Sequence, residues 1–105
     1  CTAWVEPYIM MGGYAMPCCA VMQCNDRQYL RQHCMGNLFE LSFREMWNAE
    51  YYTRFRQTLA DPQGPIPTIC KDCRVYDTQP RAEKYGYVRF RPEGITPMTR
   101  EELER

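Results

Sequence analysis

The longest regular pattern of apolar residues lies in the middle of the chain, after Ser42. Its apolar positions recur at steps of three and four residues, at Phe43, Met46, Trp47, Tyr51, Phe55 and Leu59. That spacing places the side chains along one side of an α-helix. Ser42 and Glu45 form a capping box at its start, and Asp61-Pro62 stops it. We therefore predict one amphipathic helix of about five turns whose apolar side, Trp47 included, lies in the core.

Two short β-prone runs precede that helix, at residues 6–11 and 14–18, and Gly12-Gly13 separates them. Paired glycines suit the type I′ and II′ turns of β-hairpins, because those turns need positive φ. Pro7 and Pro17 restrict the strands to edge positions or to an early end. The pattern predicts a small antiparallel hairpin whose open end brings Cys18 back towards Cys1.

The other segments carry shorter patterns. Asn25 and Gly36 frame a short helix that runs through His33. Residues 62–69 are rich in proline and predict an extended loop, and residues 85–90 predict one more short strand. Thr99 with Glu102 forms a capping box for a last helix. The expected fold class is α+β, with a small β-hairpin and an amphipathic helix as its main parts.

Charge and hydropathy argue against several classes of function. The chain has 13 basic and 13 acidic side chains, so it lacks the positive footprint of a nucleic-acid-binding protein. No apolar run approaches the roughly 20 residues of a membrane span, and no secretion leader is present. We expect a cytoplasmic location with no nucleic-acid or membrane partner. A ligand-type residue at Cys1 and a helix that opens just before the last residue suggest a piece of a larger protein.

Cysteines carry the candidate chemistry. Four of the seven fall in a spaced order: Cys1, then Gly13 and Cys18, then the pair in Cys70-Lys71-Asp72-Cys73. A Cys-x-x-Cys pair can grip one metal from a tight turn, and the hairpin would supply the other two thiolates. Four thiolates suit either zinc or an iron–sulfur cluster, and spacing alone separates the two poorly. Cys1, Cys18, Cys70 and Cys73 are therefore the candidate metal ligands.

The three other cysteines have different interpretations. Neighbouring residues on a strand point to opposite faces, so only one of Cys18 and Cys19 should face the metal. The glycine spacing favours Cys18, and Cys19 stays as its alternative. Cys24 and Cys34 are interpreted as ordinary thiols. A disulfide framework is disfavoured, because the count is odd and no secretion signal is present.

Beyond the cysteines, several short motifs follow one another in a specific order. They are Gly13-Tyr14-Ala15-Met16-Pro17-Cys18-Cys19, Gly36-Asn37-Leu38, Glu45-Met46-Trp47-Asn48, an arginine at position 54 or 56, and Cys70-Lys71-Asp72-Cys73. With these motifs, residues 1–76 resemble the SPASM/twitch domain, which follows the catalytic barrel of many radical S-adenosylmethionine enzymes. The resemblance implies a hairpin and a helix organised around one or two auxiliary [4Fe-4S] clusters, with Cys1 and Cys18 among the ligands.

The resemblance also bears on the number of clusters. The two-cluster SPASM form has further cysteines where this chain has Gln79 and Glu83. The chain is therefore more similar to the one-cluster, twitch-like form. That form implies that Cys70 and Cys73 complete a single ligand set with Cys1 and Cys18.

The resemblance implies an accessory role rather than catalysis. Radical initiation in this family needs Cys-x-x-x-Cys-x-x-Cys, and no three cysteines here have that spacing. We expect residues 1–76 to be a cluster-binding domain and residues 77–105 a C-terminal extension. The expected partner is the radical S-adenosylmethionine barrel of the same parent protein, which would bind S-adenosylmethionine and a peptide, protein or small-molecule substrate. The domain would transfer electrons, position the substrate, or do both.

Two other functions compete with that hypothesis. A structural four-cysteine zinc module would use the same ligands without redox chemistry. Direct thiol chemistry at Cys70 and Cys73 is the third possibility, with Lys71 lowering a thiol pKa. A thioredoxin-like motif should precede a helix in a βαβ unit, whereas this pair follows a proline-rich loop. The sequence therefore favours metal binding over thiol exchange.

Overall fold

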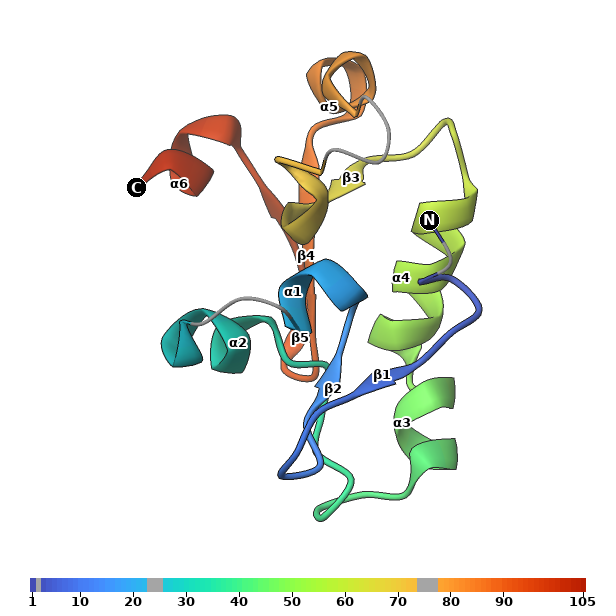
Figure 1. Cartoon of the computed structure of the whole chain (residues 1–105). Helices are drawn as coiled ribbons and strands as arrows, with labels where there is room; N and C mark the ends of the chain where they lie inside the picture. Colours follow the sequence, from blue (N-terminus) through green and yellow to red (C-terminus); the bar gives the residue numbers. More distant parts are fainter. Residues whose placement is uncertain (2, 23–25, 74–77) are drawn as a thin grey trace.

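The computed structural model describes residues 1, 3–22, 26–73 and 78–105 and has an α+β fold, as predicted (Figure 1). Along the chain the elements are β1 (Tyr8–Ile9), β2 (Ala15–Met16), α1 (Cys19–Met22), α2 (Arg27–His33), α3 (Phe43–Asn48), α4 (Glu50–Ala60), β3 (Ile66–Pro67), the 3₁₀ helix η1 (Thr68–Cys70), α5 (Gln79–Tyr85), β4 (Tyr87–Arg91), β5 (Gly94–Met98) and α6 (Arg100–Glu104). Within these described ranges, no helix has the length and apolar character needed to cross a membrane.

The predicted N-terminal hairpin is confirmed, with shorter strands than expected. β1 and β2 pair antiparallel, with Tyr8 opposite Met16. Gly12 and Gly13 have φ values of 90° and 82°, which side-chain-bearing residues rarely adopt. Met11 also belongs to the loop, because the N–H of Met10 pairs with the carbonyl oxygen of Tyr14 at 2.8 Å. The connection is therefore longer than the two-residue turn predicted.

The strand prediction fails just before the candidate ligands. β2 ends at Met16, and Pro17 separates it from α1, whose first residue is Cys19. A proline has no N–H to donate to a strand ladder, so pairing stops there. The interpretation of Cys18 and Cys19 as strand neighbours on opposite faces is therefore wrong. Cys18 lies in the link between strand and helix.

The predicted five-turn helix is two helices. α3 and α4 meet at Ala49, whose φ of −60° and ψ of 146° are extended rather than helical. The Ser42 capping box is present, with the Ser42 N–H donating to Glu45 Oε2 at 2.8 Å. The break resets the helical phase. As a result Tyr52, outside the predicted stripe, is fully buried, whereas Phe43 within it is 43% exposed.

A three-stranded sheet packs against α4. Its order is β3-β4-β5, with β3 parallel and β5 antiparallel to β4. Val88 and Phe90 on β4 are buried, and the Phe90 ring meets the Phe55 ring of α4 edge-on, with centroids 5.7 Å apart. β4 lies in the expected C-terminal extension and pairs with β3 from the expected first domain, so the two share one core. The boundary at residue 76 stays a prediction.

The predicted helix through His33 is present as α2. Its cap is Asp26, whose Oδ1 accepts from the N–H groups of Gln28 and Tyr29 at 2.9 and 3.1 Å. Asn25, the predicted cap, lies outside the described residues. The helix ends at Cys34 rather than Gly36. Gly36 instead supports the hairpin, because its carbonyl oxygen accepts from the Ala15 N–H at 2.9 Å.

Two apolar clusters form the interior. The larger one joins the hairpin, α3, α4 and β4, and contains Ala15, Met35, Met46, Tyr52, Phe55, Val88 and Phe90. The smaller one contains Ile66, Cys70 and Ala82. Leu59 of α4 packs against both clusters. α4 is thus the element that holds the hairpin, the sheet and η1 together.

Candidate metal centre

Cys70 and Cys73 lie in one tight turn. Cys70 is the last residue of η1 and is only 8% exposed. The Cys73 N–H donates to the carbonyl oxygen of Cys70 at 3.2 Å, and Thr78 Oγ1 donates to the same oxygen at 3.3 Å. Both cysteines pack in the smaller apolar cluster. The turn therefore holds two of the predicted ligands together, as the Cys-x-x-Cys spacing predicts.

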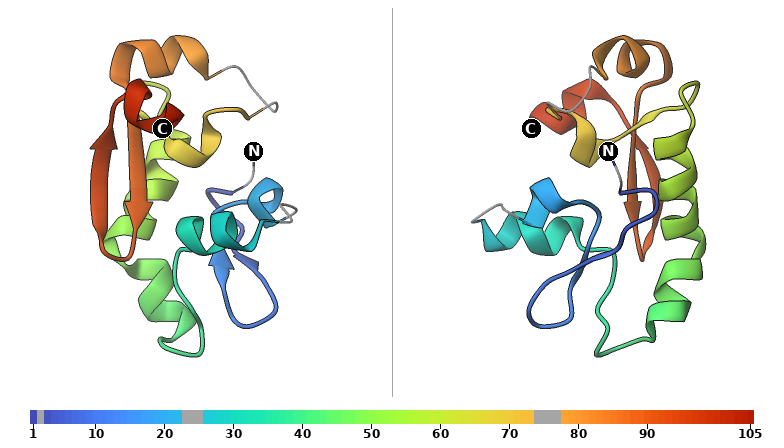
Figure 2. Two further views of the ribbon diagram at one scale, coloured as in Figure 1. Left: turned by 90° about the vertical axis from the view of Figure 1, so that its left-hand side faces the viewer. Right: turned by 45° about the vertical axis from the view of Figure 1, so that its right-hand side comes forward.

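Cys1 lies beside the end of α4. It is exposed and lines an open pocket of about 430 Å³ with Trp4, Leu59 and Ala60. Leu59 also packs against the cluster that contains Cys70 and Cys73. In both views of Figure 2 the N-terminus lies above the hairpin. The first residue and the Cys70–Cys73 turn thus share Leu59 as a neighbour.

Cys18 follows a fully buried residue, Pro17. Pro17 lines a small cavity together with Phe55 of α4 and Thr68 of η1. The segment that carries Cys18 therefore packs against both α4 and the element that ends in Cys70. Three separate segments, each with a predicted ligand, converge on the same stretch of α4.

Convergence of the segments does not bring the sulfur atoms into one coordination shell. Among the described residues, no group of three or more His, Cys, Asp or Glu side chains is placed to hold a metal ion. The structure thus brings Cys70 and Cys73 together but does not add Cys1 and Cys18 to them. The four-ligand set stays a prediction. The donor chemistry fits an iron–sulfur cluster, because the described cysteines are thiols, the precursors of the ligand form.

Tyr52 is a polar group of α4 that the sequence patterns missed. It is fully buried, and its hydroxyl oxygen has no hydrogen-bond partner among the described residues. Burial raises the pKa of Tyr52 to about 12; the positive charge of Arg56 opposes that rise, while Tyr51, Cys18 and Tyr8 add to it. Cys18 is thus close enough to act electrostatically on the phenol. No motif could identify Tyr52, because it lies outside the expected apolar stripe and is buried only as a result of the break at Ala49.

The remaining cysteines differ from the candidate ligands in their surroundings. Cys34 Sγ is 3.0 Å from the carbonyl oxygen of Gly36 and accepts from the Gly36 N–H at 3.3 Å. Burial, the largest cause, raises the pKa of the Cys34 thiol, which favours the protonated form over the ligand form. Cys19 is exposed at the start of α1. The interpretation of Cys24 lies outside the described residues.

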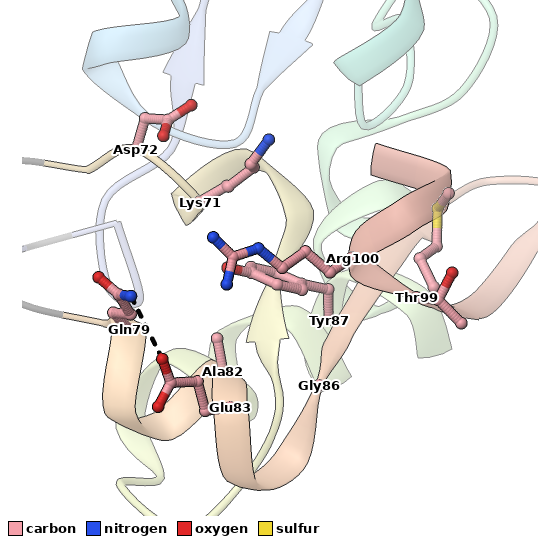
Figure 3. A pocket seen from close by; sticks show the side chains of 10 residues that line it. Lys71, Asp72, Gln79, Ala82, Glu83, Gly86, Tyr87, Thr99 and Arg100 are labelled. Carbon is pink, nitrogen blue, oxygen red and sulfur yellow. Dashed lines mark hydrogen bonds between the residues drawn. The ribbon is translucent and has the colours of Figure 1, made fainter. Parts of the chain in front are cut away.

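The two residues between Cys70 and Cys73 line a pocket of about 460 Å³ (Figure 3). Lys71 and Asp72 form one part of its wall, and Gln79 and Glu83 of α5 form another. Gln79 Nε2 donates to Glu83 Oε1 at 3.2 Å. These are the two positions at which the two-cluster form would have cysteines. An amide–carboxylate pair stands there instead.

Comparison with known proteins identifies the family. The model of the SPASM family, an iron–sulfur cluster-binding domain, matches residues 1–74. No curated protein and no solved structure matches the chain. The family match covers the hairpin, α4 and the Cys70–Cys73 turn. The chain therefore belongs to the SPASM family of iron–sulfur cluster-binding domains.

Proposed function

We propose that this chain is the auxiliary cluster-binding domain of a radical S-adenosylmethionine enzyme and holds one [4Fe-4S] cluster through Cys1, Cys18, Cys70 and Cys73. The observation that carries the proposal is the convergence of three segments on α4. Cys70 and Cys73 pack with Leu59, Cys1 lines a pocket with Leu59, and the residue before Cys18 lies beside Phe55. Four thiolates from these segments suit a cluster of this type.

Each segment has its own part in ligation. The turn at Cys70 supplies two sulfur atoms from a stretch of backbone that local hydrogen bonds hold in place. Cys1 is exposed at the chain end, and Cys18 lies in the link after β2, so both sulfur atoms would approach the turn when the ligands assemble. A bound [4Fe-4S] cluster supplies one-electron transfer. The chain holds it next to the substrate of the parent enzyme, where the domain transfers electrons or positions that substrate.

The absence of Cys-x-x-x-Cys-x-x-Cys supports an auxiliary role. We infer that the barrel of the same parent protein cleaves S-adenosylmethionine and that this domain packs against it, in the reducing cytoplasm where thiols persist. Apolar side chains at the hairpin end support such packing, because Met11 is 98% exposed and Phe39 is 83% exposed. Large exposed apolar side chains that gather at one end typify a surface for a partner.

Metal analysis of the full chain tests the proposal. The protein is purified without oxygen, reconstituted with iron and sulfide, and analysed for iron, sulfide and zinc together with its absorption spectrum. We expect about four irons and four sulfides per chain and a broad charge-transfer band. One zinc with no sulfide and no colour, even after anaerobic reconstitution, would instead identify a structural zinc module.

A further inference from the structure

The hydroxyl of Tyr52 is a buried donor that makes no hydrogen bond among the described residues. Buried polar groups in proteins are nearly always hydrogen-bonded, because leaving one without a partner is destabilising. The Tyr52 ring itself is well packed, with the Phe55 ring 6.1 Å and the Trp47 ring 5.2 Å away between centroids. The ring is therefore held in a position where its polar end lacks an acceptor within the part of the chain that the structure describes.

The segment that leaves the hairpin through Pro17 packs against the part of α4 that carries Tyr52. Ala15 of β2 belongs to the same apolar cluster as Tyr52, and Pro17 lines a cavity with Phe55, one helical turn further along α4. Tyr8 lies opposite Met16, so Tyr8 and Cys18 leave the two strands at the same end. Both residues act electrostatically on Tyr52, which is consistent with this placement.

The neighbours of the hydroxyl can be compared as acceptors. Arg56 carries only donors, and its guanidinium lies over the Tyr52 ring, 5.1 Å from the centroid. The hydroxyls of Tyr8 and Tyr51 donate to Glu6 Oε2 and to the carbonyl oxygen of Met35, and their oxygens are neutral acceptors that metal binding does not change. A cysteine sulfur is a weak acceptor as a thiol and a strong one as a thiolate, because charge strengthens hydrogen bonds. Cys18 is the neighbour whose acceptor strength rises on metal binding.

We propose that the Tyr52 hydroxyl donates a hydrogen bond to the Cys18 sulfur when that sulfur is a metal-bound thiolate. This inference rests on the proposed function, because it takes Cys18 as a ligand. Donors outside the coordination shell orient ligands and tune the metal, and a hydrogen bond to sulfur favours the more negative, reduced state. The buried hydroxyl would thus destabilise the metal-free fold slightly and stabilise the loaded one.

The substitution Tyr52→Phe separates these two effects, because it removes the hydroxyl and keeps the ring. In the metal-free full chain we expect the urea midpoint of unfolding to rise, since the unpartnered donor is gone. In the reconstituted chain we expect the midpoint reduction potential to fall and the cluster to be lost to a chelator about tenfold faster, the usual scale for such outer donors.

Tyr51→Phe is the matched control. Tyr51 donates its hydroxyl to the carbonyl oxygen of Met35, so its removal should lower the urea midpoint of the metal-free chain. It should leave the reduction potential unchanged. Opposite signs in the two metal-free variants, with a potential shift only in Tyr52→Phe, would support the inference.

Two results would overturn it. If the wild-type chain takes up iron and sulfide but Tyr52→Phe keeps the wild-type potential and chelation rate, the inference fails and the proposed function stands. If the wild-type chain takes up no cluster, both fail together. The wild-type metal content therefore distinguishes the two failures.

Discussion

The side chain of Arg81 on α5 is bonded to the backbone of Thr58 on α4. Nη2 donates to the Thr58 carbonyl oxygen at 2.6 Å and to the Pro65 oxygen at 3.0 Å, while Nε donates to the Gly64 oxygen at 2.6 Å. One guanidinium thus joins the segment after the family match to the end of the helix beneath the candidate metal centre. The described residues beyond position 74 therefore pack against residues 1–74 and stabilise them.

We expect Arg81→Ala to lower the free energy of unfolding by about 2–3 kcal/mol, because the half-buried carbonyl oxygens lose a charged donor. Urea denaturation of the metal-free full chain measures this. Arg54→Ala is the control, since Arg54 makes an exposed contact with Glu50 at 3.9 Å, and its loss should cost less than about 0.5 kcal/mol. Equal costs for the two variants would show that the Arg81 bonds do not form in solution.

We expect Cys70→Ser and Cys73→Ser each to lose bound iron after anaerobic reconstitution, because serine is a poor substitute for a cluster thiolate. Iron and sulfide analysis measures this, and the thermal transition of the loaded protein should move to lower temperature as well. Full iron content in either variant would exclude that residue from the ligand set.

Cys34→Ser and Cys24→Ser provide the controls. Cys34 is half-buried, and the shift of its thiol pKa favours the protonated form. Cys34→Ser should therefore keep the wild-type iron content, and the interpretation of Cys24 as an ordinary thiol predicts the same for Cys24→Ser. Loss of iron in Cys34→Ser would mean that the four-ligand set is wrongly chosen.

Some parts of this fold were predictable because the signal is local. Gly12-Gly13 specifies the hairpin and Ser42 with Glu45 specifies a helix start through interactions within a few residues. The break at Ala49 was not predictable, since alanine favours helix and the apolar spacing continues through it. The approach of Cys1 and of the Cys70–Cys73 turn to Leu59 depends on contacts between residues far apart in the sequence, which no spacing rule describes. The candidate ligands were chosen from cysteine spacing and stay a prediction, whereas no spacing pattern singles out Tyr52.

We expect Gly13→Ala to destabilise the hairpin more than an ordinary glycine substitution does. Gly13 has a φ of +82°, and a Cβ there would lie 2.8 Å from Asn37 Oδ1. That oxygen cannot easily move, because it accepts from the Phe39 N–H at 2.8 Å while Asn37 Nδ2 donates to the Gly12 oxygen at 3.1 Å. The left-handed conformation alone costs about 1–2 kcal/mol.

Gly86→Ala is the matched control for that variant. Its φ of +79° is also positive, but a Cβ there would meet nothing within 4 Å. Urea denaturation should therefore show a larger loss for Gly13→Ala than for Gly86→Ala. Equal losses would show that the contact with Asn37 relaxes at no cost.

We expect the metal-free chain to lose stability as the pH falls from about 6.5 to about 4, through His33. Burial, then Arg91, then Arg89, lower the pKa of His33 from 6.5 to about 4 in the folded protein. In this window the unfolded chain binds a proton on His33 that the folded chain does not, so protonation favours unfolding. The stabilising effect is present above pH 6.5.

The variant His33→Gln tests this, because it cannot titrate. Carboxylates also titrate at low pH, for example Glu45, whose pKa is lowered by hydrogen bonds from Ser42. The wild type and His33→Gln both contain them, so their effect cancels in the comparison. We expect the urea midpoint to fall more steeply between pH 7 and pH 4.5 in the wild type than in His33→Gln. Parallel pH profiles would show that His33 is solvated.

Trp47 and Arg56 form the contact that joins α3 to α4 across the break at Ala49. The guanidinium carbon of Arg56 lies 3.8 Å from the Trp47 ring centroid. The centroids of the Trp47 and Tyr52 rings are 5.2 Å apart. Trp47 is half-buried rather than a full core residue. We therefore expect Trp47→Ala to cost about 2–3 kcal/mol, below the usual value for a fully buried tryptophan, with the cation–π contact included.

Phe43→Ala removes the ring that stacks on Trp47 from the solvent side, with centroids 5.6 Å apart. Phe43 is 43% exposed, so its loss should cost less than about 1.5 kcal/mol. Chemical denaturation of Trp47→Ala, Phe43→Ala and Arg56→Gln measures how much free energy of unfolding each side chain contributes. If the double variant loses no more free energy of unfolding than either Trp47→Ala or Arg56→Gln alone, the two side chains act as one unit that holds α3 against α4. Fully additive losses would instead show that Trp47 and Arg56 stabilise the fold independently of each other.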